Sequence, residues 1–155
     1  FNSGTGGFSF WGESASPIYD DLNGKEAIEL FDLNESLLSN SQIIPLRLRE
    51  GDDASCLNLN KALRPQIYGV KTSDFSGRFE FADGNWTSLS KTIDGDTIPA
   101  LVDQNTLMWA LKMGLGDRIQ FKDGEGRPFE IEFVGAFKGS MLQGCAIHKR
   151  RRFSE

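Results

Sequence analysis

The sequence is poor in the residues on which metal and nucleophilic sites usually depend. Its 155 residues include one histidine and two cysteines, and neither a C-x-x-C pair nor a G-x-S-x-G elbow occurs. The spacing Cys145-x-x-His148 is a faint metal cue, because zinc needs four ligands, or three and a water, and only Cys56 offers a further thiol. His148 stands beside a cationic run, so we expect an exposed histidine at the boundary of an element rather than the base of a catalytic triad.

The sequence also lacks an excess of positive charge and a long apolar run. It carries 17 Lys and Arg against 22 Asp and Glu, which gives a formal net charge of −5 and a pI near 5.0. A dedicated nucleic-acid binder would need a basic face to displace phosphate counterions, so we expect no nucleic-acid partner. No apolar run approaches the ~20 residues that span a bilayer, and the chain begins at Phe1 without an initiator methionine or signal peptide. These absences predict a processed chain or a soluble piece of a larger protein.

The acidic residues are concentrated in the first part of the chain. Residues 1–60 hold 10 acidic and 3 basic residues, whereas residues 61–155 hold 12 acidic and 14 basic residues. Four of these basic residues form the run Lys149–Arg152. We expect this run to be a solvated chain end, with proximity to anionic lipid headgroups as the alternative.

Apolar residues, by contrast, are sufficient for a substantial core. They make up 39% of the sequence, and phenylalanine supplies 12 of the aromatic side chains, against 3 tryptophans and 2 tyrosines. A chain of this size buries enough apolar surface to fold without a metal or disulfide. The dominance of phenylalanine indicates that the aromatic residues fill the core.

The first half of the chain predicts short elements separated by turns. Phe8–Trp11 alternates as a half-buried strand does, and Ser16-Pro17 is typical of a helix start. A short helix is expected at Lys25–Phe31, with Ala27, Leu30 and Phe31 on one side. Further strands are predicted at 44–49, an edge strand because it contains Pro45, and at 56–60, 66–70 and 78–82, with a turn or short helix at 72–77.

The last third predicts the order strand, helix, hairpin. Ile98–Val102 is typical of a buried strand, and Asp103 or Asn105 then caps a helix that extends to Met113. Two alternating strands, 118–122 and 129–137, flank the turn sequence Asp-Gly-Glu-Gly. We therefore expect an α+β fold, with a mixed sheet, a few short helices, the 104–113 helix packed on one face of the sheet, and two lobes that divide near residue 75.

Two further motifs are better explained as turns than as sites. Gly4-Thr5-Gly6-Gly7 precedes a predicted strand and has Ser9 where a dinucleotide-binding loop needs glycine. The chain also has carboxylate pairs at Asp20-Asp21, Asp52-Asp53 and Asp94-Gly95-Asp96. Glycoside hydrolysis needs two carboxyl groups that face each other across a cleft, and a calcium loop that starts at Asp94 would have Asn105 in place of its glutamate. We interpret these residues as turn and capping groups and expect no cofactor or metal.

The two cysteines leave two alternatives open. Cys56 and Cys145 pair in an oxidising compartment, which would stabilise the fold by roughly 4 to 5 kcal/mol on the chain-entropy model, or they are two buried, reduced thiols. A titration of free thiols under denaturing, non-reducing conditions distinguishes the two alternatives.

Two parts of the sequence carry longer motifs. The first part runs from Ile98-Pro99-Ala100-Leu101-Val102-Asp103 through a helix to Met113–Ile119 and Phe129–Gly135. This order of a Pro-containing strand, a short helix, a Gly-Asp turn and a strand that ends in Val-Gly resembles the FtsX-like permeases of ABC transporters, in particular their extracytoplasmic insert, the MacB-like periplasmic core domain.

The second part is the more distinctive. Arg47–Leu59, with the run Gly-Asp-Asp-Ala-Ser-Cys-Leu-Asn-Leu, resembles one branch of these permeases, and Gly6–Tyr19 resembles an N-terminal stretch of the same branch. The similar segments together extend from about Gly6 to Gly144. The residues that carry the motifs look structural: turn glycines, a strand proline and a hairpin-capping aspartate, namely Gly51, Asp52, Asp53, Pro99, Gly116, Asp117 and Gly135.

The resemblance implies a non-enzymatic domain of residues 1–155 on the periplasmic or extracellular side of an inner-membrane protein. Its partners would be the membrane helices of the same permease, an ATP-binding subunit on the cytoplasmic side and a periplasmic partner protein. The domain would contact a substrate or partner and couple that contact to movement of the membrane helices. No catalytic residue is carried over from the family. The alternative from the residues alone is a secreted hydrolase or carbohydrate-active domain that uses the Asp-rich turns.

Overall fold

The chain folds as two compact units. The computed structural model describes residues 3–49 and 64–149. The larger unit, here the sheet unit, comprises residues 1–8 and 46–155, and the smaller, here the acidic unit, comprises Ser9–Pro45. The division expected near residue 75 is not where the chain divides, because Phe75 is buried at 4% exposure inside the sheet unit.

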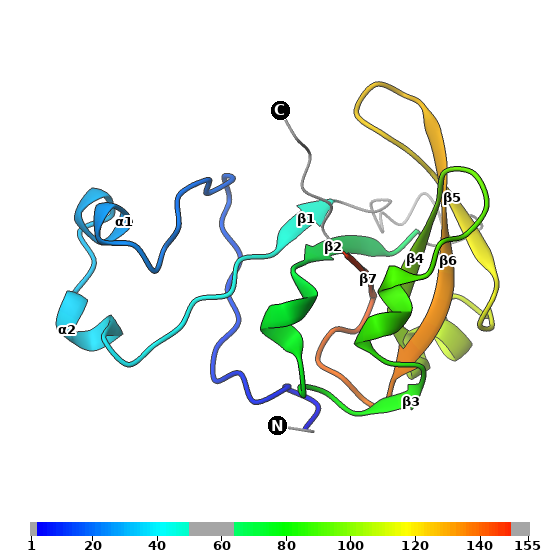
Figure 1. The fold of residues 1–155 in the computed structure, drawn as a ribbon, viewed down its shortest axis with the longest axis horizontal. Coiled ribbons are helices and arrows are strands. Elements are labelled where there is room, and N and C mark those ends of the chain that lie inside the picture. The colour runs from blue at the N-terminus through cyan, green and yellow to red at the C-terminus, as the bar shows by residue number, and fades with distance from the viewer. Residues whose placement is uncertain (1–2, 50–63, 150–155) are drawn as a thin grey trace. The chain divides into compact units, whose positions relative to one another are not determined.

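The sheet unit is built on one mixed, curled sheet of seven strands (Figure 1). The order is β1-β2-β7-β4-β6-β3, and β5 also pairs with β6. The pairs β2–β7 and β4–β6 are parallel and the others antiparallel. The α+β class with a mixed sheet is thereby confirmed. The strands are β1 (Arg47–Arg49), β2 (Gln66–Val70), β3 (Phe81–Asp83), β4 (Thr97–Asp103), β5 (Arg118–Lys122), β6 (Pro128–Phe137) and β7 (Cys145–Lys149).

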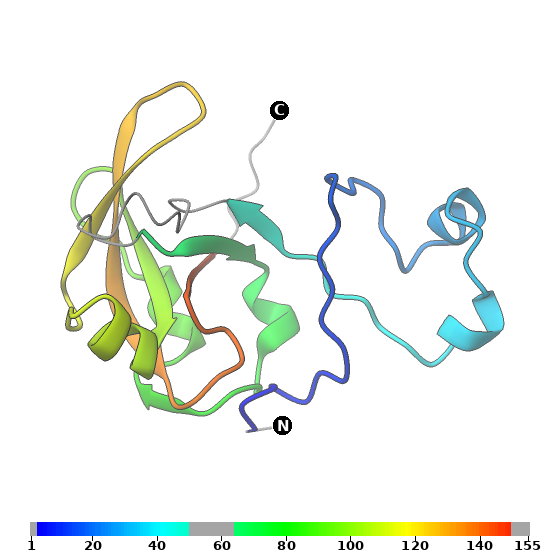
Figure 2. The same cartoon turned by 180° about the vertical axis from the view of Figure 1, so that it is seen from behind.

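The predicted strand and hairpin of the last third are confirmed. Strand β4 is buried along nearly its whole length, and β5 and β6 form the antiparallel hairpin. The turn between them is closed by the Asp123 amide, which donates to the Arg127 carbonyl at 2.9 Å. Figure 2 shows the hairpin from behind, with β5 and β6 extending beyond the rest of the sheet.

The helix predicted to follow β4 forms, but as a π-helical turn. This turn, η3 (Thr106–Ala110), includes a bond from the Leu111 amide to the Thr106 carbonyl at 2.9 Å, five residues back. Leu107 from this turn is buried against the sheet. The wider turn lets the chain reach the sheet at Leu107 while it leaves Met108 and Trp109 exposed, at 48% and 74%.

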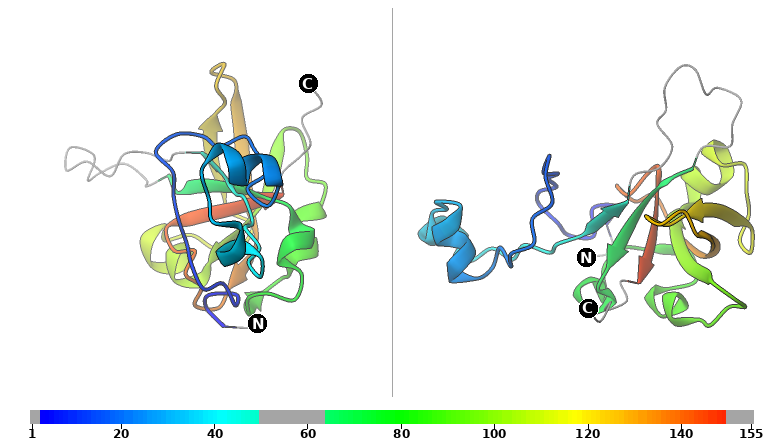
Figure 3. Two further views of the ribbon diagram at one scale, coloured as in Figure 1. Left: turned by 90° about the vertical axis from the view of Figure 1, so that its left-hand side faces the viewer. Right: turned by 90° about the horizontal axis from the view of Figure 1, so that it is seen from above.

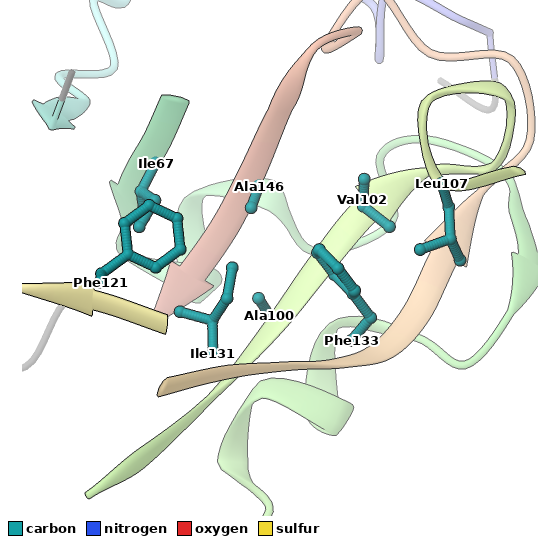
Figure 4. Packing of buried hydrophobic residues seen from close by; sticks show 8 residues of the cluster. All are labelled: Ile67, Ala100, Val102, Leu107, Phe121, Ile131, Phe133 and Ala146. Carbon is teal, nitrogen blue, oxygen red and sulfur yellow. The ribbon is translucent and has the colours of Figure 1, made fainter. Parts of the chain in front are cut away.

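One apolar core lies between the strands and η3 (Figure 4). It combines small residues on the central strands with large residues from neighbouring strands, so that the layers interdigitate. Phe133 has no exposed surface and Ile131 is 1% exposed. The members are Ile67, Ala100, Val102, Leu107, Phe121, Ile131, Phe133 and Ala146.

A second cluster is aromatic and surrounds Phe137 at the end of β6. Phe79, Phe81 and Trp86 lie 5.5, 4.9 and 5.3 Å from its ring centroid. These residues come from β3 and from the segments around the 3₁₀ turns η1 (Thr72–Phe75) and η2 (Trp86–Ser90). Phe75 and Phe8 complete the cluster. The expectation that the aromatic residues fill the core is thus met in these two clusters. It is wrong for five exposed aromatic side chains, namely Phe10, Trp11, Tyr19, Phe31 and Trp109.

The cluster also anchors the N-terminal segment to the sheet unit. Arg78 lies 4.4 Å above the Phe8 ring and donates from Nη1 to the Gly6 carbonyl at 2.8 Å. Gly6 has a φ of +61°, and a Cβ there would lie 2.5 Å from the Phe79 ring. Only glycine fits this position without displacing the ring.

Three predicted elements differ from the structure. The predicted strand Phe8–Trp11 is irregular, since no strand among the described residues pairs with it and Phe10 is 93% exposed. No helix follows Ser16-Pro17, because an Asp-rich turn interrupts the chain before an apolar face can form. The strand predicted at 78–82 is shorter and begins at Phe81, because Phe79 has a φ of +66°, which a strand does not allow.

The edge strand predicted at 44–49 is confined to β1, which lies at the edge of the sheet and begins two residues after Pro45, a residue without an amide hydrogen. The strand at 66–70 and the 3₁₀ turn within 72–77 form as predicted. The strand predicted at 56–60 lies outside the described residues. Figure 3 shows β7 between β2 and β4 from above.

The acidic unit contains two short helices, α1 (Lys25–Leu30) and α2 (Glu35–Leu38). The short helix expected at Lys25–Phe31 is confirmed, although Ala27 is buried while Leu30 and Phe31 are exposed. The Asn23 side chain closes the segment that carries both helices: Nδ2 donates to the Ile43 carbonyl at 2.9 Å, and Oδ1 accepts from the Ile43 amide at 2.8 Å.

Candidate interaction surface

The motif residues within the described part of the chain occupy turns and close approaches. Pro99 is buried in β4. Gly116 has a φ of +87°, and its amide donates to the Phe133 carbonyl at 2.8 Å. The Asp117 carboxylate accepts from the Gly114 amide at 2.7 Å, which fixes the turn into β5. A Cβ on Gly135 would lie 2.8 Å from Leu101 Cδ2 and 3.0 Å from the Asp83 carbonyl oxygen. These contacts position backbone, and none of them forms a reaction centre.

The motif residues Gly51, Asp52 and Asp53 lie outside the described residues, as does Cys56. Cys145 is a buried free thiol that donates to the Leu142 carbonyl at 3.1 Å. Burial, and secondarily the nearby Asp103 carboxylate, raises its pKa to about 12. A thiol that keeps its proton at neutral pH is a poor nucleophile and a poor metal ligand. The pairing of Cys145 with Cys56 stays a prediction.

Asp103 is a fully buried carboxylate that organises the start of η3. Its Oδ1 accepts from the Asn105 amide at 2.9 Å and its Oδ2 from the Ser140 amide at 2.6 Å. Of the two caps predicted for this turn, Asp103 therefore supplies the acceptor. The Thr106 hydroxyl oxygen also accepts from the Gly144 amide at 2.9 Å. The bonds from the Ser140 and Gly144 amides tie the connection between β6 and β7 to the start of η3. The buried Asp103 carboxylate therefore has a structural role.

Two of the carboxylates singled out in the sequence, Asp21 and Asp94, are held in local structure. Asp21 accepts hydrogen bonds from the backbone and side chain of Asn23, and these bonds lower its pKa. Asp94 pairs with Arg118 at 2.8 Å, and the hydrogen bond from that guanidinium lowers the pKa of Asp94. Arg118 also contacts Glu132 at 2.8 Å and Glu130 at 3.5 Å, and its hydrogen bonds to Asp94 and then to Glu132 raise its pKa. This arrangement fits the predicted turn and surface roles.

The basic end of the chain is described only at its first residue. Lys149 is exposed, and its ammonium group donates to Ser90 Oγ at 3.2 Å. His148 is half-buried at the end of β7, where its Nδ1 lies 3.1 Å from the Lys149 carbonyl oxygen. It lies at an element boundary, as predicted, but is less exposed than predicted.

Within residues 3–49 and 64–149, no three His, Cys, Asp or Glu side chains gather as a metal site would require. In the same part of the chain, no helix has the length and apolar character to cross a membrane.

The exposed apolar side chains are the feature that the sequence interpretation missed. Six of them belong to the acidic unit, where they occur as three adjacent pairs. Two more, Met108 and Trp109, lie on η3. The sequence does contain a signal of this exposure, because each pair lies close to carboxylates. An apolar pair surrounded by acidic residues has few apolar neighbours against which it can be buried. The pairs are Phe10-Trp11, Ile18-Tyr19 and Leu30-Phe31.

Such a surface is suited to binding a partner through apolar contacts. Aromatic and aliphatic side chains that alternate with charges are typical of contact surfaces, in which an apolar centre is surrounded by a polar rim. Comparison of the chain with protein-family models and with curated proteins found no match.

Proposed function

We propose that this chain is the extracytoplasmic domain of an FtsX-like ABC-transporter permease, of the MacB-like periplasmic core type. In this role it contacts a substrate or a partner protein outside the inner membrane and couples that contact to movement of the membrane helices. ATP hydrolysis belongs to a separate subunit on the cytoplasmic side. The assignment to this family rests on the sequence resemblance of 98–135 and of 47–59.

The observation that supports a contact role is the set of exposed apolar pairs in the acidic unit. Phe10, Tyr19 and Leu30 are 93%, 85% and 66% exposed. Soluble domains rarely present several large apolar side chains within one short segment unless that segment meets a partner. The ordered sheet unit supplies a scaffold, and the acidic unit supplies the contact.

The family assignment is tested by the gene and by topology in the cell. The reading frame that contains residues 1–155 is expected to encode about four membrane helices, with this domain between the first and second. A single cysteine introduced at the exposed residue Ser41, in a chain whose own cysteines are replaced, is then expected to react in intact cells with a thiol reagent that does not cross the inner membrane. A stand-alone reading frame, or labelling only after the cells are lysed, would contradict the permease assignment.

Measurement of nucleotide binding tests the proposal that ATP hydrolysis belongs to a separate subunit. Calorimetry of residues 1–155 with ATP and Mg²⁺ is expected to show no saturable binding, because nothing in the sequence resembles a P-loop. Saturable binding would count heavily against the proposal.

A further inference from the structure

The acidic unit combines two properties that together specify the chemistry of what it binds. The first is exposed apolar surface, in the pairs Phe10-Trp11, Ile18-Tyr19 and Leu30-Phe31. The second is the position of the carboxylates: Glu13 follows the first pair by two residues, Asp20 follows the second directly, and Glu29 and Asp32 flank the third. Each apolar pair is therefore bordered by negative charge.

The negative charge of this unit cannot be neutralised from within. Ser9–Pro45 contains seven acidic residues and one basic residue, Lys25, for a net charge of −6. The acidic unit thus carries more negative charge than the whole chain, whose net charge is −5. Apolar contacts favour any apolar partner, but bringing a neutral or acidic surface against these carboxylates leaves them desolvated or repelled. The charge therefore selects a basic partner.

The unit has little internal packing to compete with such contacts. Among its described side chains, only Ala27 is buried. The segment is instead held by polar closure, through the two bonds between the Asn23 side chain and the Ile43 backbone. A segment with few buried apolar contacts lies at the low end of local stability, and contact with a partner would supply the burial that it lacks.

The sheet unit offers an internal comparison. Met108 and Trp109 on η3 are exposed to a similar degree, but the charged residue nearest in sequence is Lys112. If exposed apolar surface alone drove binding, both places would bind the same partners. If charge selects the partner, a basic partner would prefer the acidic unit.

From these observations we infer that Ser9–Pro45 is a docking segment for a protein whose contacting surface carries basic side chains around an apolar centre, such as a basic amphipathic helix. This inference rests on the contact role in the proposed function and not on the permease assignment. Phe10, Tyr19, Leu30 and Phe31 supply the apolar contacts, and the bordering carboxylates set the charge of the partner.

The experiment uses residues 1–155 and a fluorescent probe peptide of about 18 residues, built of leucine and lysine so that a helix has one apolar and one basic face. Fluorescence anisotropy is expected to show saturable binding that weakens as salt is raised, because ionic screening reduces the attraction. A leucine–glutamate peptide of the same pattern and a lysine–leucine peptide in scrambled order are expected to bind weakly or not at all.

Two sets of substitutions separate apolar contact from charge. Tyr19→Ser with Phe31→Ser is expected to weaken binding about tenfold or more, as truncation of aromatic contacts at an interface does. Asp20→Asn, Glu29→Gln and Asp32→Asn together are expected to weaken it and to reduce its dependence on salt. The matched controls lie in the sheet unit: Met108→Ser with Trp109→Ser, and Asp83→Asn, Asp96→Asn and Glu125→Gln together. Both controls are expected to leave the affinity within about twofold of the parent chain.

Four results of the binding experiments, and one result on self-association, would overturn the inference. The first four are unchanged affinity in the Tyr19 and Phe31 variant, equal loss in the Met108 and Trp109 control, equal binding of the glutamate peptide, and binding of neutral phospholipid vesicles but not of the basic peptide. Self-association of the chain that is abolished by the Tyr19 and Phe31 substitutions would also overturn it, since the occupant would then be a second copy. If the thiol-labelling test of topology fails, the permease assignment is wrong but the docking segment can still be correct. If the peptide-binding test fails, the docking segment is wrong but the permease assignment can still be correct.

Discussion

The two units of this protein are stabilised by different interactions. The sheet unit buries large side chains on both sides of β6, with Phe133 and Phe137 fully enclosed. The acidic unit buries Ala27 among its described side chains and is closed by hydrogen bonds from Asn23. Burial of apolar surface is the main stabilising contribution in folded proteins, so nearly all of the stability is expected to reside in the sheet unit. The comparison indicates a division between scaffold and contact surface.

The largest expected difference concerns phenylalanine in the two units. Phe133→Ala is expected to lower the free energy of unfolding by about 3–5 kcal/mol, because it removes buried surface and leaves a cavity. Phe31→Ala, at a side chain that is 43% exposed, is expected to change it by no more than about 0.5 kcal/mol. Urea unfolding measured by circular dichroism checks both variants. Equal losses would contradict the division between the units.

The next difference concerns polar closure. Asp103→Ala leaves the Asn105 amide and the buried Ser140 amide without their acceptor, so a loss of about 1–3 kcal/mol in the free energy of global unfolding is expected. Asn23→Ala is expected instead to open the acidic unit alone, seen as faster hydrogen exchange at the Ile43 amide while β4 and β6 stay protected. Loss of protection in β4 and β6 of the Asn23 variant would show that the two units unfold together.

Glycine gives a third comparison. Gly135→Ala is expected to destabilise the protein by about 1–3 kcal/mol, because the new methyl group would meet Leu101 and the Asp83 carbonyl. Gly12→Ala in the acidic unit meets nothing within 4 Å and is expected to be within about 0.5 kcal/mol of the parent chain. Thermal unfolding midpoints of the two variants check this. An unchanged unfolding midpoint in the Gly135 variant would mean that β4 and the Asp83–Gly84 turn can move away from β6 to make room for the methyl group at little cost in free energy.

The last expected effect appears only at alkaline pH and is absent from comparisons made at neutral pH. The folded Cys145 thiol keeps its proton to about pH 12, whereas the unfolded thiol loses it near its ordinary pKa of 9.0. Unfolding above that value releases a proton, so the stabilisation is complete below about pH 9 and declines as the pH rises toward 12. Cys145→Ala is expected to flatten this part of the pH profile of the unfolding free energy. An identical decline in the variant would assign it to other groups, and a bond between Cys145 and Cys56 would remove the titration altogether.

The sequence predicted those elements in which a local pattern and its burial partner agree. Strand β4 and the β5–β6 hairpin follow from a continuous apolar run, strict alternation and a Gly-containing turn. The failure at Phe8–Trp11 has the opposite cause: the pattern alternates, but in the part of the chain that the structure describes no strand pairs with it, and alternation alone does not reveal whether a partner exists. Helical spacing likewise predicted η3 but could not distinguish a π-turn from an α-helix, because both place Leu107 toward the sheet.

The candidate surface was harder to predict than the fold. Leu30 and Phe31 were expected on the same side of a short helix as Ala27, and only Ala27 is buried. Apolar residues at helical spacing indicate which face would be buried, but a helix of 6 residues covers little area, and the sequence does not tell what packs against it. The negative charge, in contrast, could be read directly from residues 1–60.

The most direct test of the account is hydrogen exchange of residues 1–155 with and without the leucine–lysine peptide. Without the peptide, slow exchange is expected in β2, β4, β6 and β7, and exchange in Ser9–Pro45 is expected to be faster than in these strands. With the peptide, added protection is expected within Ser9–Pro45 and nowhere in the sheet unit. Added protection around Met108 and Trp109, or none in Ser9–Pro45 at saturating peptide, would contradict the division into a stable scaffold and an acidic docking segment.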